Sequence, residues 1–121
     1  MGFTIKARCD RFAFRVVALS RSLFEEGQEP MLVENFLAIT AKLGAAVTRA
    51  ASSHSKRIHY HYMIAAYSYA KESLYWLNMV HASGVLDEDL YESLKEDCDA
   101  IIRILKEARK IVMLYKKMKS K

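Results

Sequence analysis

Residues able to bind a metal ion or act as nucleophiles are few in this chain, which has four histidines and two cysteines among 121 residues. His59 and His61 are two positions apart, about 200° around a helix, so a regular helix cannot direct both at one ion. A di-iron bundle needs Glu-x-x-His pairs, and no glutamate stands three residues before a histidine. His54 and His81 have no metal-binding partner at a useful spacing either. The sequence therefore predicts no metal site and no cofactor.

The two cysteines lack the spacing of a reactive or metal-binding pair. Cys9 and Cys98 are far apart and form no C-x-x-C motif, so we expect reduced thiols packed in a core. Neither has a histidine nearby in sequence, and no G-x-S-x-G elbow or glycine-rich phosphate loop is present. We therefore expect no enzymatic activity. An enzyme that handles a metal or nucleotide through His59, His61 and the surrounding tyrosines is the least favoured hypothesis.

Residues 56–62 (KRIHYHY) combine cations, imidazoles and aromatic rings. Such groups can hold phosphates and stack on bases. The alternative is that these tyrosines are amphipathic interface residues with solvated hydroxyls and that the histidines are partly packed. Arg49, Lys56 and Arg57 lie on both sides of a predicted helix junction, which makes that corner the best candidate for contact with an anion.

The net charge of +5 is unevenly distributed. Residues 86–102 hold seven acids and one base, Lys95, whereas residues 103–121 hold eight bases and one acid, Glu107. Acids at the start of a helix and bases at its end both complement the helix macrodipole, so this polarity has a structural cause. The functional alternative is a basic tail that binds phosphates. Its residues are Lys116, Lys117, Lys119 and Lys121.

Helix-breaking residues divide the chain into four segments. Gly27 and Pro30 suit the end of one helix and the first turn of the next, Ser55 suits an N-cap, and Gly84 ends a third helix before Asp87 caps a fourth. We predict helices over about residues 7–26, 31–51, 56–82 and 88–119. Because the connections are short, neighbouring helices must be antiparallel. The sequence predicts an all-α protein, an antiparallel up-down four-helix bundle in one domain, residues 1–121.

Apolar residues recur at spacings of three and four in every predicted helix and so predict the core. The predicted core residues are Ala13, Val16, Val17, Ser20, Leu23 and Phe24; then Leu32, Phe36, Ile39, Leu43, Val47 and Ala50; then Met63, Ala66, Ala70, Ser73 and Leu77; and finally Leu90, Leu94, Cys98, Ile101, Leu105, Ala108, Val112 and Tyr115.

The third predicted helix is apolar around most of its circumference. One apolar side can face the bundle core, so the other side predicts contact with a second subunit. The residues expected there are Tyr60, Tyr67, Leu74 and Trp76. We expect copies of the chain to associate.

Membrane insertion and secretion are not expected. No uncharged apolar run approaches the roughly 18 residues of a membrane-spanning helix, and residues 1–10 lack the apolar centre of a signal peptide. We expect a cytoplasmic protein.

Several runs resemble one bacterial family. They are residues 44–51 (GAAVTRAA), Ser55-Lys56, residues 66–77 (AYSYAKESLYWL) and residues 83–86 (SGVL). This pattern is similar to the bacterial four-helix bundle protein family first noted in open reading frames within intervening sequences of 23S ribosomal RNA genes. The similarity extends from Phe12 to Val112. That family is similar in fold to the accessory variability determinant of diversity-generating retroelements, a pentameric barrel that binds nucleic acid and associates with reverse transcriptase.

The resemblance implies an up-down bundle, assembly into a ring of five copies and a role connected with RNA or DNA. The chain departs from the family where the second helix ends, since the usual Asn-Ile-Arg-Glu-Ala corresponds here to residues 46–50 (AVTRA). Ala46 replaces a polar side chain and Arg49 replaces an acid. Tyr69 stands where an acid is common, and His59 stands where an aromatic residue is common. These changes remove a polar network and raise the local positive charge.

Two hypotheses of function follow. The first is a non-enzymatic homo-oligomeric bundle that binds nucleic acid through Arg49, Lys56, Arg57 and the basic tail, as an accessory of ribosomal RNA or of a reverse transcriptase. The second is a protein–protein interaction scaffold that does not bind nucleic acid.

Overall fold

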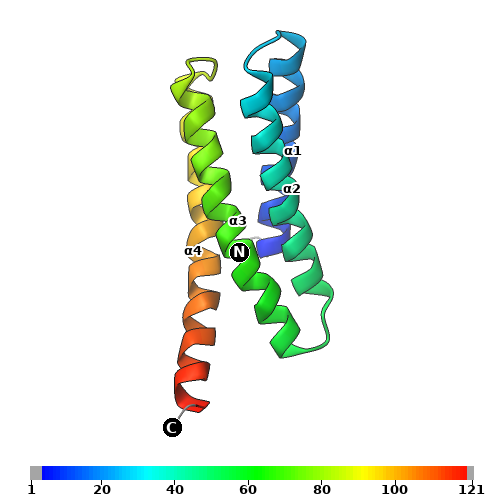
Figure 1. Cartoon of the computed structure of the whole chain (residues 1–121), viewed down its shortest axis with the longest axis vertical. Coiled ribbons are helices and arrows are strands. Elements are labelled where there is room, and N and C mark those ends of the chain that lie inside the picture. Colours follow the sequence, from blue (N-terminus) through cyan, green and yellow to red (C-terminus); the bar gives the residue numbers. More distant parts are fainter. Residues whose placement is uncertain (1–3, 120–121) are drawn as a thin grey trace.

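Four α-helices joined by short connections make up almost all of residues 4–119, the part of the chain that this computed structural model describes. They are α1 (Ile5–Glu25), α2 (Pro30–Ser52), α3 (Lys56–Ala82) and α4 (Glu88–Lys119). Each helix runs antiparallel to the next, so the α1–α2 and α3–α4 connections lie at one end and the α2–α3 connection lies at the other (Figure 1). The predicted four-helix arrangement is confirmed. Assembly into a ring stays a prediction.

Capping residues explain where the helices begin and end. The hydroxyl of Ser55 accepts a hydrogen bond from the Ile58 amide at 3.3 Å, and the carboxylate of Asp87 accepts one from the Leu90 amide at 3.4 Å. Gly27 and Gly84 follow α1 and α3 with φ of 69° and 85°, the left-handed conformation that ends many helices and that glycine adopts without strain. The punctuation residues in the sequence therefore predicted the helix bounds to within two residues.

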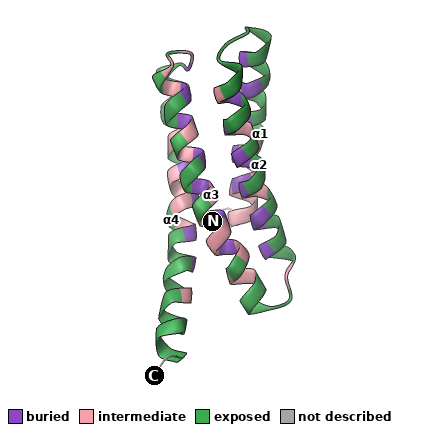
Figure 2. Cartoon of the chain, in the orientation of Figure 1, coloured by how far each residue is buried: buried purple, intermediate pink, exposed green. Residues whose placement is uncertain are grey.

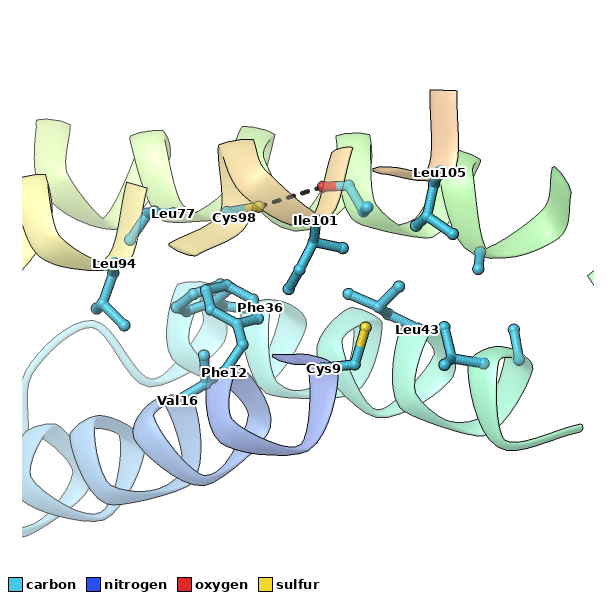
Figure 3. Packing of buried hydrophobic residues seen from close by; sticks show 14 of the residues in the cluster. Cys9, Phe12, Val16, Phe36, Leu43, Leu77, Leu94, Cys98, Ile101 and Leu105 are labelled. Atoms are coloured by element: carbon cyan, nitrogen blue, oxygen red, sulfur yellow. Dashed lines mark hydrogen bonds between the residues drawn. The ribbon is translucent and has the colours of Figure 1, made fainter. Parts of the chain in front are cut away.

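One hydrophobic core runs along the bundle axis. Phe12 of α1 meets Phe36 of α2 edge to face, with ring centroids 6.4 Å apart, and Leu77, Leu94 and Ile101 of α3 and α4 close over them (Figure 3). Close packing of this kind makes each large buried side chain contribute strongly to stability. The stripes predicted for α2 and α3 lie in this core, apart from the half-buried Leu32.

Three predicted core residues were wrong. Val17 and Phe24 of α1 are 46% and 40% exposed, and Tyr115 of α4 is 60% exposed. Cys9 and Phe12 are buried in α1 where Val17 and Phe24 were expected to be, because the face of α1 that packs inward is rotated from the one that the sequence suggested. Tyr115 is exposed because the end of α4 extends away from the other helices (Figures 1 and 2).

The lengths of α1 and α4 differ, at 21 and 32 residues. The two helices are joined where they run side by side. The Arg15 guanidinium donates to the Asp97 carboxylate at 2.6 Å and to the Ser93 hydroxyl at 2.8 Å. Because α1 begins near the middle of the long axis, the last third of α4 has no α1 beside it (Figure 1).

Among residues 4–119, α2 is the one helix that by length and composition could cross a membrane, with a mean hydropathy of 1.3 over 18 residues. Its apolar character has an explanation inside the bundle. Val33, Phe36, Leu43 and Val47 are each 1% exposed and lie in the core. A core helix commonly passes this test, so the finding gives weak support for a membrane span.

Replacing Phe12 with alanine should lower the free energy of unfolding by about 3–5 kcal/mol, because a fully buried ring leaves a cavity. Urea unfolding followed by far-ultraviolet circular dichroism measures the change. The control is Phe14→Ala in the same helix, where the ring is 76% exposed, and the change should stay below about 0.5 kcal/mol. Equal losses for the two variants would contradict the assignment of the α1 core face.

Candidate basic surface at one end of the bundle

The fold brings two basic segments, far apart in sequence, to the same end of the molecule. Arg49 lies in the last turn of α2, and Lys56 and Arg57 lie in the first turn of α3. Lys116, Lys117 and Lys119 lie in the last turn of α4. All six side chains are exposed, and the C-terminal end of α4 reaches the same end of the bundle as the α2–α3 connection (Figure 1). Lys121 lies outside the described residues.

The two halves of the bundle have opposite charge. Residues 13–37 and 71–97 make up the half of the bundle that contains the α1–α2 and α3–α4 connections. They include eleven of the 14 acidic residues but only four of the 19 lysines and arginines. The remaining bases concentrate in the other half. Antiparallel packing causes this separation, since it places the acidic start of α4 at the same end as the acidic α1–α2 connection and the basic end of α4 at the same end as the α2–α3 connection (Figure 1).

The cations at the start of α3 have no structural cause in the helix macrodipole. A positive charge in the first turn opposes the macrodipole, and α3 has Lys56 and Arg57 there and no acid. The lysines at the end of α4 are at the favourable terminus, so their presence is explained without a ligand. The cations at the start of α3 therefore give a stronger indication of a ligand than the lysines at the end of α4 do.

Aromatic rings accompany the cations at this corner. The Arg49 guanidinium lies 5.8 Å from the centroid of the Tyr62 ring, a cation–π distance. His61 is exposed and meets Tyr62 edge to face at 5.3 Å. Nδ1 of His59 donates to the Ala50 carbonyl at 2.8 Å, so this imidazole satisfies a backbone acceptor at the end of α2. His59 is thereby a structural residue, whereas Arg49 and His61 face outward.

A shallow groove lies beside Arg49. Ala41, Lys42, Ala45 and Arg49 of α2 and Tyr69 of α3 line it. Two of these residues are cations and one has a phenol hydroxyl, groups that can contact an anion, and the two alanines leave space between them. Its place next to the corner enlarges the surface on which a polyanion can rest.

The four residues predicted at a subunit interface are only partly available for one. Tyr60, Tyr67, Leu74 and Trp76 are half-buried and pack against the core of their own chain. Tyr67 also has cations over its ring, Lys71 at 5.3 Å and Arg109 at 5.9 Å. Their role at an interface stays a prediction.

Other large apolar side chains are more exposed than these four. Tyr75, which meets Trp76 edge to face, is 56% exposed, and Ile58 is 49% exposed. The position of Tyr75 opposite the buried stripe of α3 could have been found by counting turns from that stripe.

His81 has partners that sequence spacing did not suggest. Its ring stacks on Tyr91 with centroids 3.6 Å apart, and its Nε2 lies 2.7 Å from the Glu88 carboxylate. The Tyr91 hydroxyl donates to Asn78 at 2.7 Å. These contacts join the end of α3 to the start of α4. Within residues 4–119 no group of three or more histidine, cysteine or acidic side chains is placed to hold a metal ion.

The thiols are positioned for packing. Burial raises the pKa of Cys9 from 9.0 to about 12, with a smaller contribution from Asp10. Burial likewise raises the pKa of Cys98 to about 12, with Asp99 adding to it, and its thiol donates to the Ala70 carbonyl at 3.6 Å. Because the thiolate is the nucleophile, a thiol with such a pKa is unreactive at neutral pH.

The fold and surface together define a class of protein, an antiparallel four-helix bundle with one basic end. A comparison with solved structures finds a similar protein in Bacteroides thetaiotaomicron VPI-5482, a member of the S23 ribosomal protein family with unknown function. The two chains are 25% identical, the match covers 84% of this chain and 94% of the other, and the TM-score is 0.78. No protein-family model and no curated protein matches this chain. The likeness supports the bundle, and the similar protein supplies no activity.

The folded protein should react slowly with a disulfide reagent at pH 8, and both thiols should react in denaturant. Between pH 9 and 12 the free energy of unfolding should fall, because the unfolded thiols lose protons before the buried ones do. The double variant Cys9→Ala/Cys98→Ala should show a weaker dependence on pH in this range. Rapid labelling of the folded wild-type protein would contradict the burial.

Proposed function

We propose that this chain is a non-enzymatic, self-associating four-helix bundle that binds nucleic acid with the basic end of the molecule. The observation that carries the proposal is that Arg49, Lys56 and Arg57 lie at the same end of the molecule as the lysines of the α4 terminus (Figure 1), although about 60 residues separate Arg57 from Lys116 in sequence. Clustered lysines and arginines bind phosphates by releasing counterions. Lys56 and Arg57 oppose the macrodipole of α3, which favours a ligand over a structural role for them. Arg49, beside the Tyr62 ring, adds a cation next to an aromatic surface on which a base can stack.

Assembly supports the same proposal. Each copy offers one basic end, so a homo-oligomer multiplies contacts that are weak one at a time. The outer faces of α3 and α4 are the proposed subunit contacts, with Tyr60, Tyr67, Leu74 and Trp76 at their margins. We propose a pentamer in the cytoplasm.

The resemblance in sequence and the S23-family neighbour together support membership of the intervening-sequence family. That membership would connect the protein with ribosomal RNA or with a reverse transcriptase. The alternative is a protein scaffold, whose contact with its partner should survive digestion with nuclease.

The double variant Lys56→Glu/Arg57→Glu should weaken binding to RNA or DNA about tenfold or more and should reduce the dependence of log K on log salt by about one to two. Filter-binding titrations across a range of salt concentrations measure both quantities. The matched control is Arg21→Glu/Lys71→Glu, which changes the net charge equally in the acidic half and should bind almost as the wild type does. Equal effects of the two variants would mean that total charge, and not this corner, sets binding.

Light scattering should give a mass several times the 13.9 kDa of one chain, and about five times for the proposed ring. Trp76 is the single tryptophan, so its fluorescence should shift to shorter wavelength as dilute protein is concentrated and assembles. The variant Trp76→Ala should assemble less readily, with its helix content retained. A mass of one chain at high concentration would contradict the proposed assembly.

A further inference from the structure

A stripe of exposed apolar side chains marks the part of α4 that α1 does not reach. Arg15 of α1 bonds to Asp97, which fixes the line of α4 that faces α1. At spacings of seven this line continues as Ile104, Ile111 and Met118, with a drift of only about 20° per heptad. Ile104 is half-buried, Ile111 is 51% exposed and Met118 is 74% exposed. Exposure therefore rises where α1 is no longer alongside.

Two further residues widen this line into a docking face. Leu114 and Tyr115 are 62% and 60% exposed and lie three and four residues after Ile111, on the same side of the helix. We call Ile111, Leu114, Tyr115 and Met118 the tail stripe. The Lys119 ammonium lies 5.1 Å from the Tyr115 ring, and Lys110 and Lys116 are exposed on the same turns. An occupant of the tail stripe must be apolar at its centre and acidic at its edge.

The opposite end of the same chain has that composition. Met31 and Phe24 are 75% and 40% exposed at the α1–α2 connection. The carboxylates around them are Glu25, Glu26, Glu29 and Glu34, all exposed. We call these six residues the acidic corner.

The two surfaces lie at opposite ends of one rod, so a chain cannot join its own tail stripe to its own acidic corner (Figure 1). We infer that the tail stripe of one copy docks on the acidic corner of a second copy, in a head-to-tail contact. Charge complementarity selects this occupant, because pairing two tail stripes would bring lysines against lysines. A contact between two different surfaces leaves one of each free, so it can repeat along a line of copies or of rings. This contact is separate from the lateral one in the proposed assembly.

Two variants test the contact from its two sides. The tail variant, Leu114→Ser/Met118→Ser, removes the apolar centre and keeps every lysine, so it should still bind nucleic acid as the proposed function requires. The corner variant, Glu25→Lys/Glu26→Lys/Met31→Ser, reverses the charge at the end of α1, where cations favour the helix macrodipole. Helix content by circular dichroism confirms that each variant is folded.

Sedimentation velocity of nuclease-treated protein is the measurement, in about 50 mM and about 500 mM salt, where surface charges are weakly and strongly screened. The wild type should form larger species at low salt than at high salt. Each variant alone should lose that growth. In an equimolar mixture the two variants should pair, because the tail variant keeps an intact acidic corner and the corner variant keeps an intact tail stripe. Association should stop at one unit of each variant, since the pair has no further intact surfaces to offer.

Three outcomes would overturn the inference. The first is that the folded variants do not pair in the mixture, and the second is that the corner variant associates as the wild type does. The third is that the tail variant loses nucleic-acid binding while the wild type shows no salt-sensitive growth. The last result would assign the tail stripe to nucleic acid. Loss of the head-to-tail contact with normal nucleic-acid binding would leave the proposed function standing.

Discussion

Antiparallel burial of one apolar stripe from each of four helices is the constraint on which the rest of this structure depends. The connections are only a few residues long, so a helix can bury its stripe only against a neighbour of opposite direction. Phe12, Phe36 and Leu77 are at most 1% exposed because all four helices contribute to one core. That arrangement decides which distant segments share an end, and the surface chemistry follows from it.

Separation of charge is the main such consequence. The helix macrodipole accounts for the acidic start and basic end of α4, but it does not account for Lys56 and Arg57 at the start of α3. Their charge adds to that of the α4 terminus only because the fold places the two at the same end (Figure 1). Helix stability therefore explains the lysines at the end of α4, whereas Lys56 and Arg57 give the stronger argument for a ligand.

Much of the fold could be predicted from local signals. Gly27, Ser55 and Gly84 identified the helix ends because capping depends on a few neighbouring residues. The rotation of α1 could not be predicted, since Val17 and Phe12 are both apolar and only the positions of three other helices decide which one is buried. The exposure of Tyr115 was missed for a related reason, because heptad spacing cannot show where a neighbouring helix begins.

The candidate site was predicted in its parts and not in its arrangement. Arg49, Lys56 and the α4 lysines were identified by residue type. In an up-down bundle α2 and α4 run in the same direction, so their C-terminal ends lie at the same end of the molecule. The sequence already permitted that argument. The structural role of His59 was not predictable, because its bond to the Ala50 carbonyl depends on how α2 and α3 cross. Contacts between helices carry information that spacing within a helix does not.

Opposite charge at the two ends also gives the molecule a permanent dipole moment along its length. In a ring of parallel copies these moments would add, so one rim would be positive and the other negative. Such a ring would have two chemically different faces, and a polyanion would approach along the axis from one side only. Sidedness of this kind would arise from subunits that are all identical, with no second protein to mark the direction.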